Sequence, residues 1–219
     1  MAEEAVPLKD AMARKMASEN RRVQTDYPAF AKAYDKLIAR LVAGRAGGGA
    51  PKVGDVLPPF MLPDAEGRLV SLGDFSAAKS VVISINRGHW CTYCRVEFES
   101  MRAITDEVRR RGGAVLAITP DRQRYLRQLR EDLDLPFPLL SDMDNGYAMS
   151  LGLVVWCGDE VRTLYRSIDW HLDDFQGNDG WMVPIPATYV VAPDGRIKAS
   201  FVEPDFRQRI EPAAILDAI

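Results

Sequence analysis

Short apolar runs rich in β-branched residues alternate with amphipathic stretches along most of this chain. The run at 80–85 is typical of a buried strand, and apolar residues from Cys94 to Val108 recur at helical spacing behind it. The same patterns predict a hairpin at 60–62 and 69–72, strands at 114–118, 137–140, 187–191 and 196–202, and helices at 121–133, 146–151 and 160–166. This alternation predicts an α/β fold with a central mixed sheet flanked by helices.

The first fifty residues follow a different pattern. Two amphipathic helices are predicted between residues 8 and 42, with a break near Tyr27 and Pro28. The segment 44–51 contains four glycines and a proline, which predicts a flexible linker. We therefore expect an N-terminal helical extension with its linker over 1–51 and a compact domain over 52–219. The extension is expected to be dispensable for the chemistry of that domain and to support association or packing.

Two cysteines provide the clearest chemical signal. Cys91 and Cys94 lie where the buried strand ends and the helical pattern begins, next to Trp90. Backbone N–H groups and the helix dipole stabilise an anion at a helix N-terminus, and such sites lower a thiol pKa from about 8.5 to roughly 3.5–7.5. Two intervening residues also bring the sulfurs close enough to form a disulfide. This pattern predicts thiol redox chemistry.

A zinc site is the main alternative for a Cys-x-x-Cys pair. There is no second pair, and His89 and His171 are the only histidines. We therefore expect neither a metal nor another cofactor. A purely structural role for the two cysteines in the helix is a less favoured alternative to redox chemistry.

The neighbouring residues allow more than one role. Arg87 could lower a thiol pKa and orient a substrate, or form a surface ion pair. His89 could transfer protons or only be exposed, and Trp90 is expected to pack over a disulfide. Cys157 could resolve an oxidised thiol, although free cysteines are commonly small buried apolar residues.

Composition narrows the class of protein. The 219 residues include 47% hydrophobic residues, enough for a substantial core, and three cysteines are too few for a disulfide framework. The net charge of −3 argues against nucleic acid as the main partner. The acidic first residues are unlike a signal peptide, and nothing reaches transmembrane length, so we expect a cytoplasmic protein with no membrane partner.

The order of motifs resembles the peroxiredoxin-like branch of the AhpC/TSA family (alkyl hydroperoxide reductase and thiol-specific antioxidant), which has the thioredoxin fold. The resemblance covers residues 52–212, most of the chain. The matching segments are Val53-Gly54-Asp55, Pro59-Phe60-Met61-Leu62, Arg87-Gly88-His89-Trp90-Cys91-Thr92-Tyr93-Cys94, Pro184-Ile185-Pro186-Ala187-Thr188-Tyr189-Val190-Val191, Pro204-Asp205 and Arg209-Ile210-Glu211-Pro212.

The resemblance implies two alternative assignments of the thiols. By the peroxiredoxin pattern Cys94 attacks the peroxide, Cys91 stands at the family's threonine and Arg87 at its proline. Glu97 then matches the glutamate that follows the attacking cysteine. By the thioredoxin pattern Cys91 attacks and Cys94 is its buried partner. Pro186 would then be a cis-proline beside the disulfide, and it stands near the place of the family's activating arginine.

The implied function is a thiol-dependent peroxidase that reduces hydroperoxides through a Cys-x-x-Cys dithiol and disulfide cycle. A thioredoxin-like or glutathione-linked donor would restore the dithiol, and the chain could form a homo-oligomer. One alternative is a thioredoxin-like protein-disulfide reductase. A second, non-enzymatic alternative is a redox-sensing module in which disulfide formation changes how the N-terminal helices dock on a partner.

Overall fold

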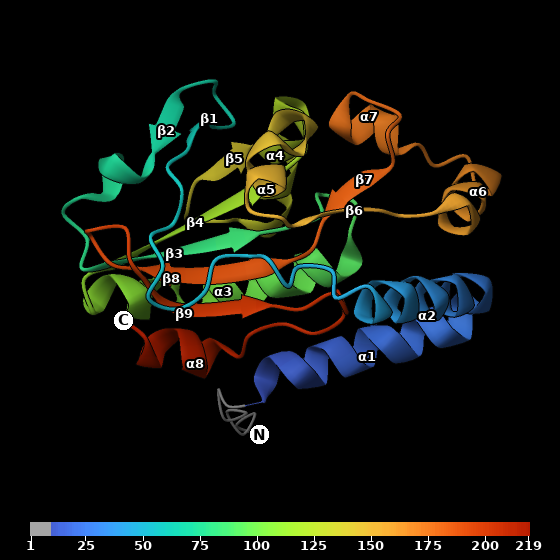
Figure 1. Ribbon diagram of the computed structural model, residues 1–219, viewed down its shortest axis with the longest axis horizontal. Helices are drawn as coiled ribbons and strands as arrows, with labels where there is room; N and C mark the ends of the chain where they lie inside the picture. The colour runs from blue at the N-terminus through green and yellow to red at the C-terminus, as the bar shows by residue number, and fades with distance from the viewer. Residues whose placement is uncertain (1–9) are drawn as a thin grey trace.

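A five-stranded mixed sheet forms the centre of the molecule (Figure 1). The computed structural model describes residues 10–219. The strand order is β5-β4-β3-β8-β9, in which β3, β4 and β5 are parallel and β8 and β9 run antiparallel to their neighbours. The strands are β3 (Ser80–Ile85), β4 (Gly113–Thr119), β5 (Leu139–Ser141), β8 (Ala187–Val191) and β9 (Ile197–Val202). The predicted α/β fold with a central mixed sheet is confirmed.

Both faces of the sheet are covered, which explains why its inner strands are mostly apolar. All residues of β3 and β8 are buried. Val82 belongs to the core on one side, whereas Val81, Ile83 and Ile85 belong to the core on the other. The first core is shared with α3 (Thr92–Arg110), α4 (Gln123–Leu133) and α8 (Pro212–Asp217), and the second with α5 (Gly146–Ser150) and the segment 50–60.

Two small antiparallel pairs lie outside the central sheet. The predicted hairpin forms as β1 (Met61–Pro63) and β2 (Leu69–Ser71). The patterns did not predict the second pair, β6 (Val154–Trp156) and β7 (Met182–Pro184). The chain between these two strands forms α6 (Asp159–Ser167) and α7 (Leu172–Gln176), at the end of the molecule where α2 (Pro28–Ala43) lies (Figure 1). Two short 3-10 helices, Leu72–Phe75 and Met143–Asn145, complete the described elements.

The two N-terminal helices form as predicted but do not stand apart. They are α1 (Ala11–Asp26) and α2 (Pro28–Ala43), with the break at Pro28; the predicted start at residue 8 lies outside the described residues. Figure 1 shows them packed beside each other at the start of α3. Met16, Phe30 and Leu37 are buried in the same core as α3. No helix within residues 10–219 is long and apolar enough to span a membrane.

The glycine-rich segment 44–51 is packed rather than flexible, which corrects the linker prediction. Its backbone makes successive turn hydrogen bonds from Ala46, Gly48 and Ala50. Gly47 has a φ of 78°, and a Cβ there would lie 3.1 Å from Val202 and 3.2 Å from Ile185. Glycine is therefore needed here for close approach and a left-handed backbone. The division of the chain at residue 52 stays a prediction.

We predict that Phe30→Ala lowers the free energy of unfolding by about 3 kcal/mol, because it removes a buried ring and leaves a cavity. Phe30 packs edge-on against Tyr34 and Tyr165, which joins α2 to α6. Val42→Ala, at an exposed position of the same helix, should cost less than about 0.5 kcal/mol. Urea denaturation measures both, and equal small losses would show that α2 lies outside the cooperative unit.

Candidate active site

The two cysteines lie at the start of α3, as the sequence predicts. Cys91 is the N-cap residue with an extended backbone, and Cys94 lies in the first turn. Cys91 is 3% exposed and Cys94 is fully buried, and neither is in a disulfide. The open N-terminus of a helix stabilises a thiolate at this position.

The thiol pair holds one negative charge at neutral pH. Burial alone raises the pKa of Cys91, but hydrogen bonds from Cys94 oppose this effect. The charges of Arg87 and Arg209 lower it further, so that the pKa of Cys91 is about 6. Burial, the hydrogen bond with Cys91 and the charge of Cys91 raise the pKa of Cys94 well above its usual range. Cys91 is therefore the ionised sulfur.

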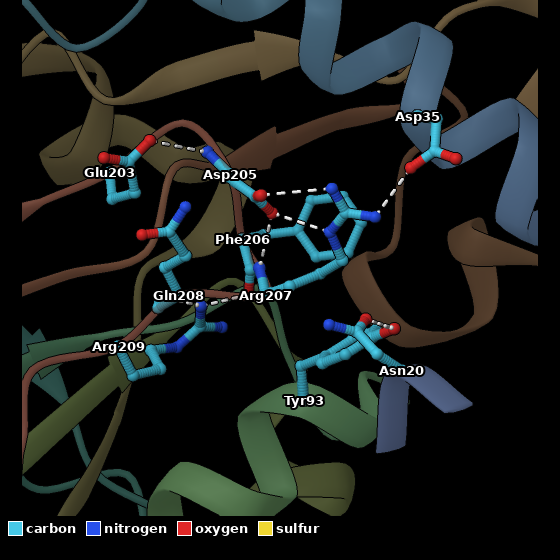
Figure 2. Close-up of polar contacts among 9 residues, drawn as sticks. All are labelled: Asn20, Asp35, Tyr93, Glu203, Asp205, Phe206, Arg207, Gln208 and Arg209. Carbon is cyan, nitrogen blue, oxygen red and sulfur yellow. Dashed lines mark hydrogen bonds and ion pairs between the residues drawn. The ribbon is translucent and has the colours of Figure 1, made fainter. Parts of the chain in front are cut away.

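Arg209 is the cation that the sequence analysis did not assign, although its segment was among those that carried the resemblance. Its Nη2 lies 3.6 Å from Cys94 Sγ, and its Nε donates to Glu97 Oε2 at 2.5 Å. Glu97 also accepts hydrogen bonds from Ser84 and Thr188, on β3 and β8. Figure 2 shows Arg209 directed back toward the backbone of its own loop, where it also donates to the carbonyl of Gln208.

Arg87 is a second buried cation, and its surroundings differ from those of Arg209. The guanidinium lies 4.0 Å from the centre of the Phe206 ring and 4.8 Å from that of Trp90. Its Nε and Nη2 have no hydrogen-bond partner. The nearby acids are thiols and phenols, of which Cys91 has the largest effect on its charge. Trp90 thus covers the cation beside the thiols.

His89 lies away from the thiols. Its ring stacks on Phe175 and its Nε2 lies 3.5 Å from Asp132. Burial and the charge of Arg95 lower its pKa, which favours the neutral ring. Its backbone N–H donates to the buried Asp121, whose pKa is raised to about 7 mainly by burial. The contacts of the His89 side chain indicate packing.

Pro186 does not have the predicted cis bond. No peptide bond within residues 10–219 is cis. Pro186 is buried between β7 and β8, and only two residues separate these strands, so the chain passes from one to the other in extended form. It lines a small hollow with Arg87 and Phe206. The cis-proline assignment is therefore wrong, and the predicted substrate contact stays a prediction.

A pocket of about 200 Å³ opens onto Cys91. Most of its wall is apolar or aromatic, and α1 and α2, with Tyr27 between them, supply five of the twelve lining residues. It is lined by Arg22, Val23, Tyr27, Phe30, Tyr34, Arg87, Trp90, Cys91, Thr92, Tyr93, Tyr165 and Ile168. The N-terminal helices thus form part of the site, which corrects the expectation that they are independent of it. Within residues 10–219, no cluster of His, Cys, Asp and Glu is arranged to hold a metal ion.

Known proteins share this sequence pattern and fold. Peroxiredoxin Bcp of Escherichia coli K12 is 34% identical over 105 residues, and the match covers 48% of this chain and 65% of that protein. Peroxidoxin BcpB of Mycobacterium tuberculosis superimposes with a TM-score of 0.58 at 20% identity, covering 76% of this chain and 95% of that one. A mutant of peroxiredoxin 6 of Arenicola marina gives a TM-score of 0.60 at 18% identity, covering 76% of this chain and 72% of that one.

The two structural likenesses establish the thioredoxin fold of the peroxiredoxins for this chain. The sequence match extends further than the cysteine motif, because the model of the AhpC/TSA family matches residues 53–200. That range includes both thiols, Arg87, Glu97 and the strand that follows Pro186, and it makes up more than half of the chain. The chain therefore belongs to the AhpC/TSA family.

Proposed function

We propose that this protein is a thiol-dependent peroxidase that reduces hydroperoxides through Cys91 and Cys94. The observation that carries this proposal is the pair of buried arginines, Arg87 and Arg209, which keeps one sulfur of the pair ionised at neutral pH. A thiolate is the form of cysteine that attacks peroxide. The sulfenic acid and the disulfide that follow this attack require only these two sulfurs.

Cys91 is the attacking sulfur in this proposal. It lines the pocket and carries the lowered pKa, whereas Cys94 is fully buried behind it and stays protonated. These two observations favour the thioredoxin-like order of attack over the peroxiredoxin-like order. The Cys91 thiolate attacks one peroxide oxygen, the O–O bond breaks, and the second oxygen leaves as an alkoxide that takes up a proton. Cys94 then displaces hydroxide from the Cys91 sulfenic acid, which releases water and forms the disulfide.

The narrow access to Cys91 favours a peroxide over a protein substrate. A folded protein disulfide must reach the attacking sulfur, yet Cys91 is only 3% exposed at the base of a pocket of about 200 Å³. Reduction by a thioredoxin-like or glutathione-linked thiol completes the cycle, and the cytoplasm is the reducing compartment that supplies such donors. Rapid reduction of insulin disulfides with no peroxide consumption would instead support the protein-disulfide reductase.

The first prediction of this proposal concerns the order of the thiols. Cys91→Ser should abolish the reaction with hydrogen peroxide, because Cys94 is fully buried and does not line the pocket. Cys94→Ser should still consume one equivalent of peroxide and then stop with Cys91 as sulfenic acid. Stopped-flow peroxide consumption and mass spectrometry of the cysteines measure both. Sulfenic acid on Cys94 in the Cys91→Ser protein would restore the peroxiredoxin-like order.

The second prediction concerns pH. Since the pKa of Cys91 is lowered to about 6, the rate of its oxidation should rise with pH through about 6 and level off above 7. Arg87→Met should move this midpoint upward, because it removes a cation that favours the thiolate. Arg102→Met, on the exposed side of α3, is the matched control and should leave the midpoint unchanged. A midpoint near the usual thiol value in the native protein would contradict the proposal.

A further inference from the structure

A pair of tyrosines forms part of the wall of the pocket that opens onto Cys91. Tyr34 of α2 and Tyr165 of α6 line this pocket together with Arg87 and Cys91. Their hydroxyl oxygens are 2.5 Å apart, so one phenol donates a hydrogen bond to the other. The pair therefore presents polar hydrogen-bonding atoms in a wall that is mostly apolar or aromatic.

One proton of this pair is left without an acceptor. Each phenol has one O–H group to donate, and the hydrogen bond between the two tyrosines uses only one of them. Neither hydroxyl makes a second hydrogen bond to any residue in the range 10–219. Tyr93, on the same wall, differs because it donates its proton to Asn20. The second proton of the pair is thus free for a ligand that enters the pocket.

The same pocket holds the attacking sulfur and a cation. Cys91 is the ionised sulfur, and Nε and Nη2 of the buried Arg87 have no hydrogen-bond partner. Burial raises the pKa of both phenols, the charge of Arg87 lowers it, and the charge of Cys91 raises it further. The two hydroxyls therefore share the pocket, and the electric field, of the nucleophile and the cation.

We propose that the Tyr34–Tyr165 pair is the acid that protonates the oxygen leaving the peroxide. The inference rests on the proposed peroxidase function and names the proton donor of its first step. The Cys91 thiolate forms a bond to the terminal oxygen of the hydroperoxide, the O–O bond breaks, and the leaving alkoxide takes the free phenol proton. The products are Cys91 sulfenic acid, an alcohol and a phenolate, and solvent then returns one proton to the phenolate.

The charges in the pocket favour a phenol as this donor. The step consumes the negative charge of Cys91, which opposes ionisation of both tyrosines, and it removes that anion from Arg87. A phenolate formed in the same pocket supplies a new anion to a buried cation that would otherwise be unpaired. A phenol is also a stronger acid than water, so it can give its proton to the leaving oxygen.

The test compares peroxides whose leaving groups differ in basicity. Hydrogen peroxide and tert-butyl hydroperoxide leave a strong base that needs a proton, whereas peracetic acid leaves acetate, which does not. In the full-length reduced protein, Tyr34→Phe combined with Tyr165→Phe should slow oxidation of Cys91 by the first two peroxides roughly a hundredfold, as expected for loss of a general acid. The stopped-flow rate with peracetic acid should stay nearly unchanged. Tyr125→Phe, outside the pocket, is the matched control and should alter none of the three rates.

Each single variant keeps one phenol with a free proton, so we expect it to lose less than the double variant. If the double variant does not fold, the slower of the two single variants should show the same contrast between tert-butyl hydroperoxide and peracetic acid. An equal loss for all three peroxides, or no loss for any of them, would overturn the proposal, since a purely structural hydrogen bond affects them alike.

Mass spectrometry of the cysteines in the same samples separates this result from failure of the proposed function. If the native protein forms the Cys91–Cys94 disulfide but the variants show no contrast between peroxides, the peroxidase stands and only the role of the tyrosines is removed. If peroxide forms no disulfide in the native protein, both proposals fall.

Discussion

The site depends on two buried positive charges and the anion that they require. Arg209 is paired with Glu97, but Arg87 has no carboxylate. The two guanidinium groups and one carboxylate leave a single positive charge, which the Cys91 thiolate balances. Removal of one partner from a buried ion pair is strongly destabilising, so the ionised sulfur is part of the folded structure as well as the reactive group.

The sheet fixes this arrangement. Glu97 is held by Ser84 from β3 and Thr188 from β8, so the central strands orient the carboxylate that in turn holds Arg209. Arg207, two residues before Arg209, is bound by Asp205 and by Asp35 of α2, which ties this loop to the N-terminal helices (Figure 2). Tyr93 likewise donates to Asn20 of α1. The helices that form the pocket wall are thereby joined to the loop that carries the cation.

The sequence pattern predicted the elements whose residues are set by burial of neighbouring positions in the chain. The strand at 80–85 is buried on both faces and is therefore mostly apolar, and the helical spacing after Cys94 follows from one buried helix face. The placement of Cys91 and Cys94 at the helix start followed directly. Arg209 could not be assigned a role, because it is 112 residues from Glu97 and its loop has no periodic pattern. Glycine content at 44–51 indicated flexibility, whereas tertiary contacts at Gly47 require glycine for close approach.

The most direct test of the account is a pH titration of the reduced protein by nuclear magnetic resonance, with carbon-13 at the cysteine Cβ atoms. Assignment uses the single-cysteine variants. One signal, from Cys91, is predicted to titrate near pH 6, whereas Cys94 remains protonated until well above the usual thiol range and the pKa of Cys157 is raised by burial. Three cysteines that titrate together at ordinary thiol values would show that the buried arginines do not hold a thiolate, and would contradict the account.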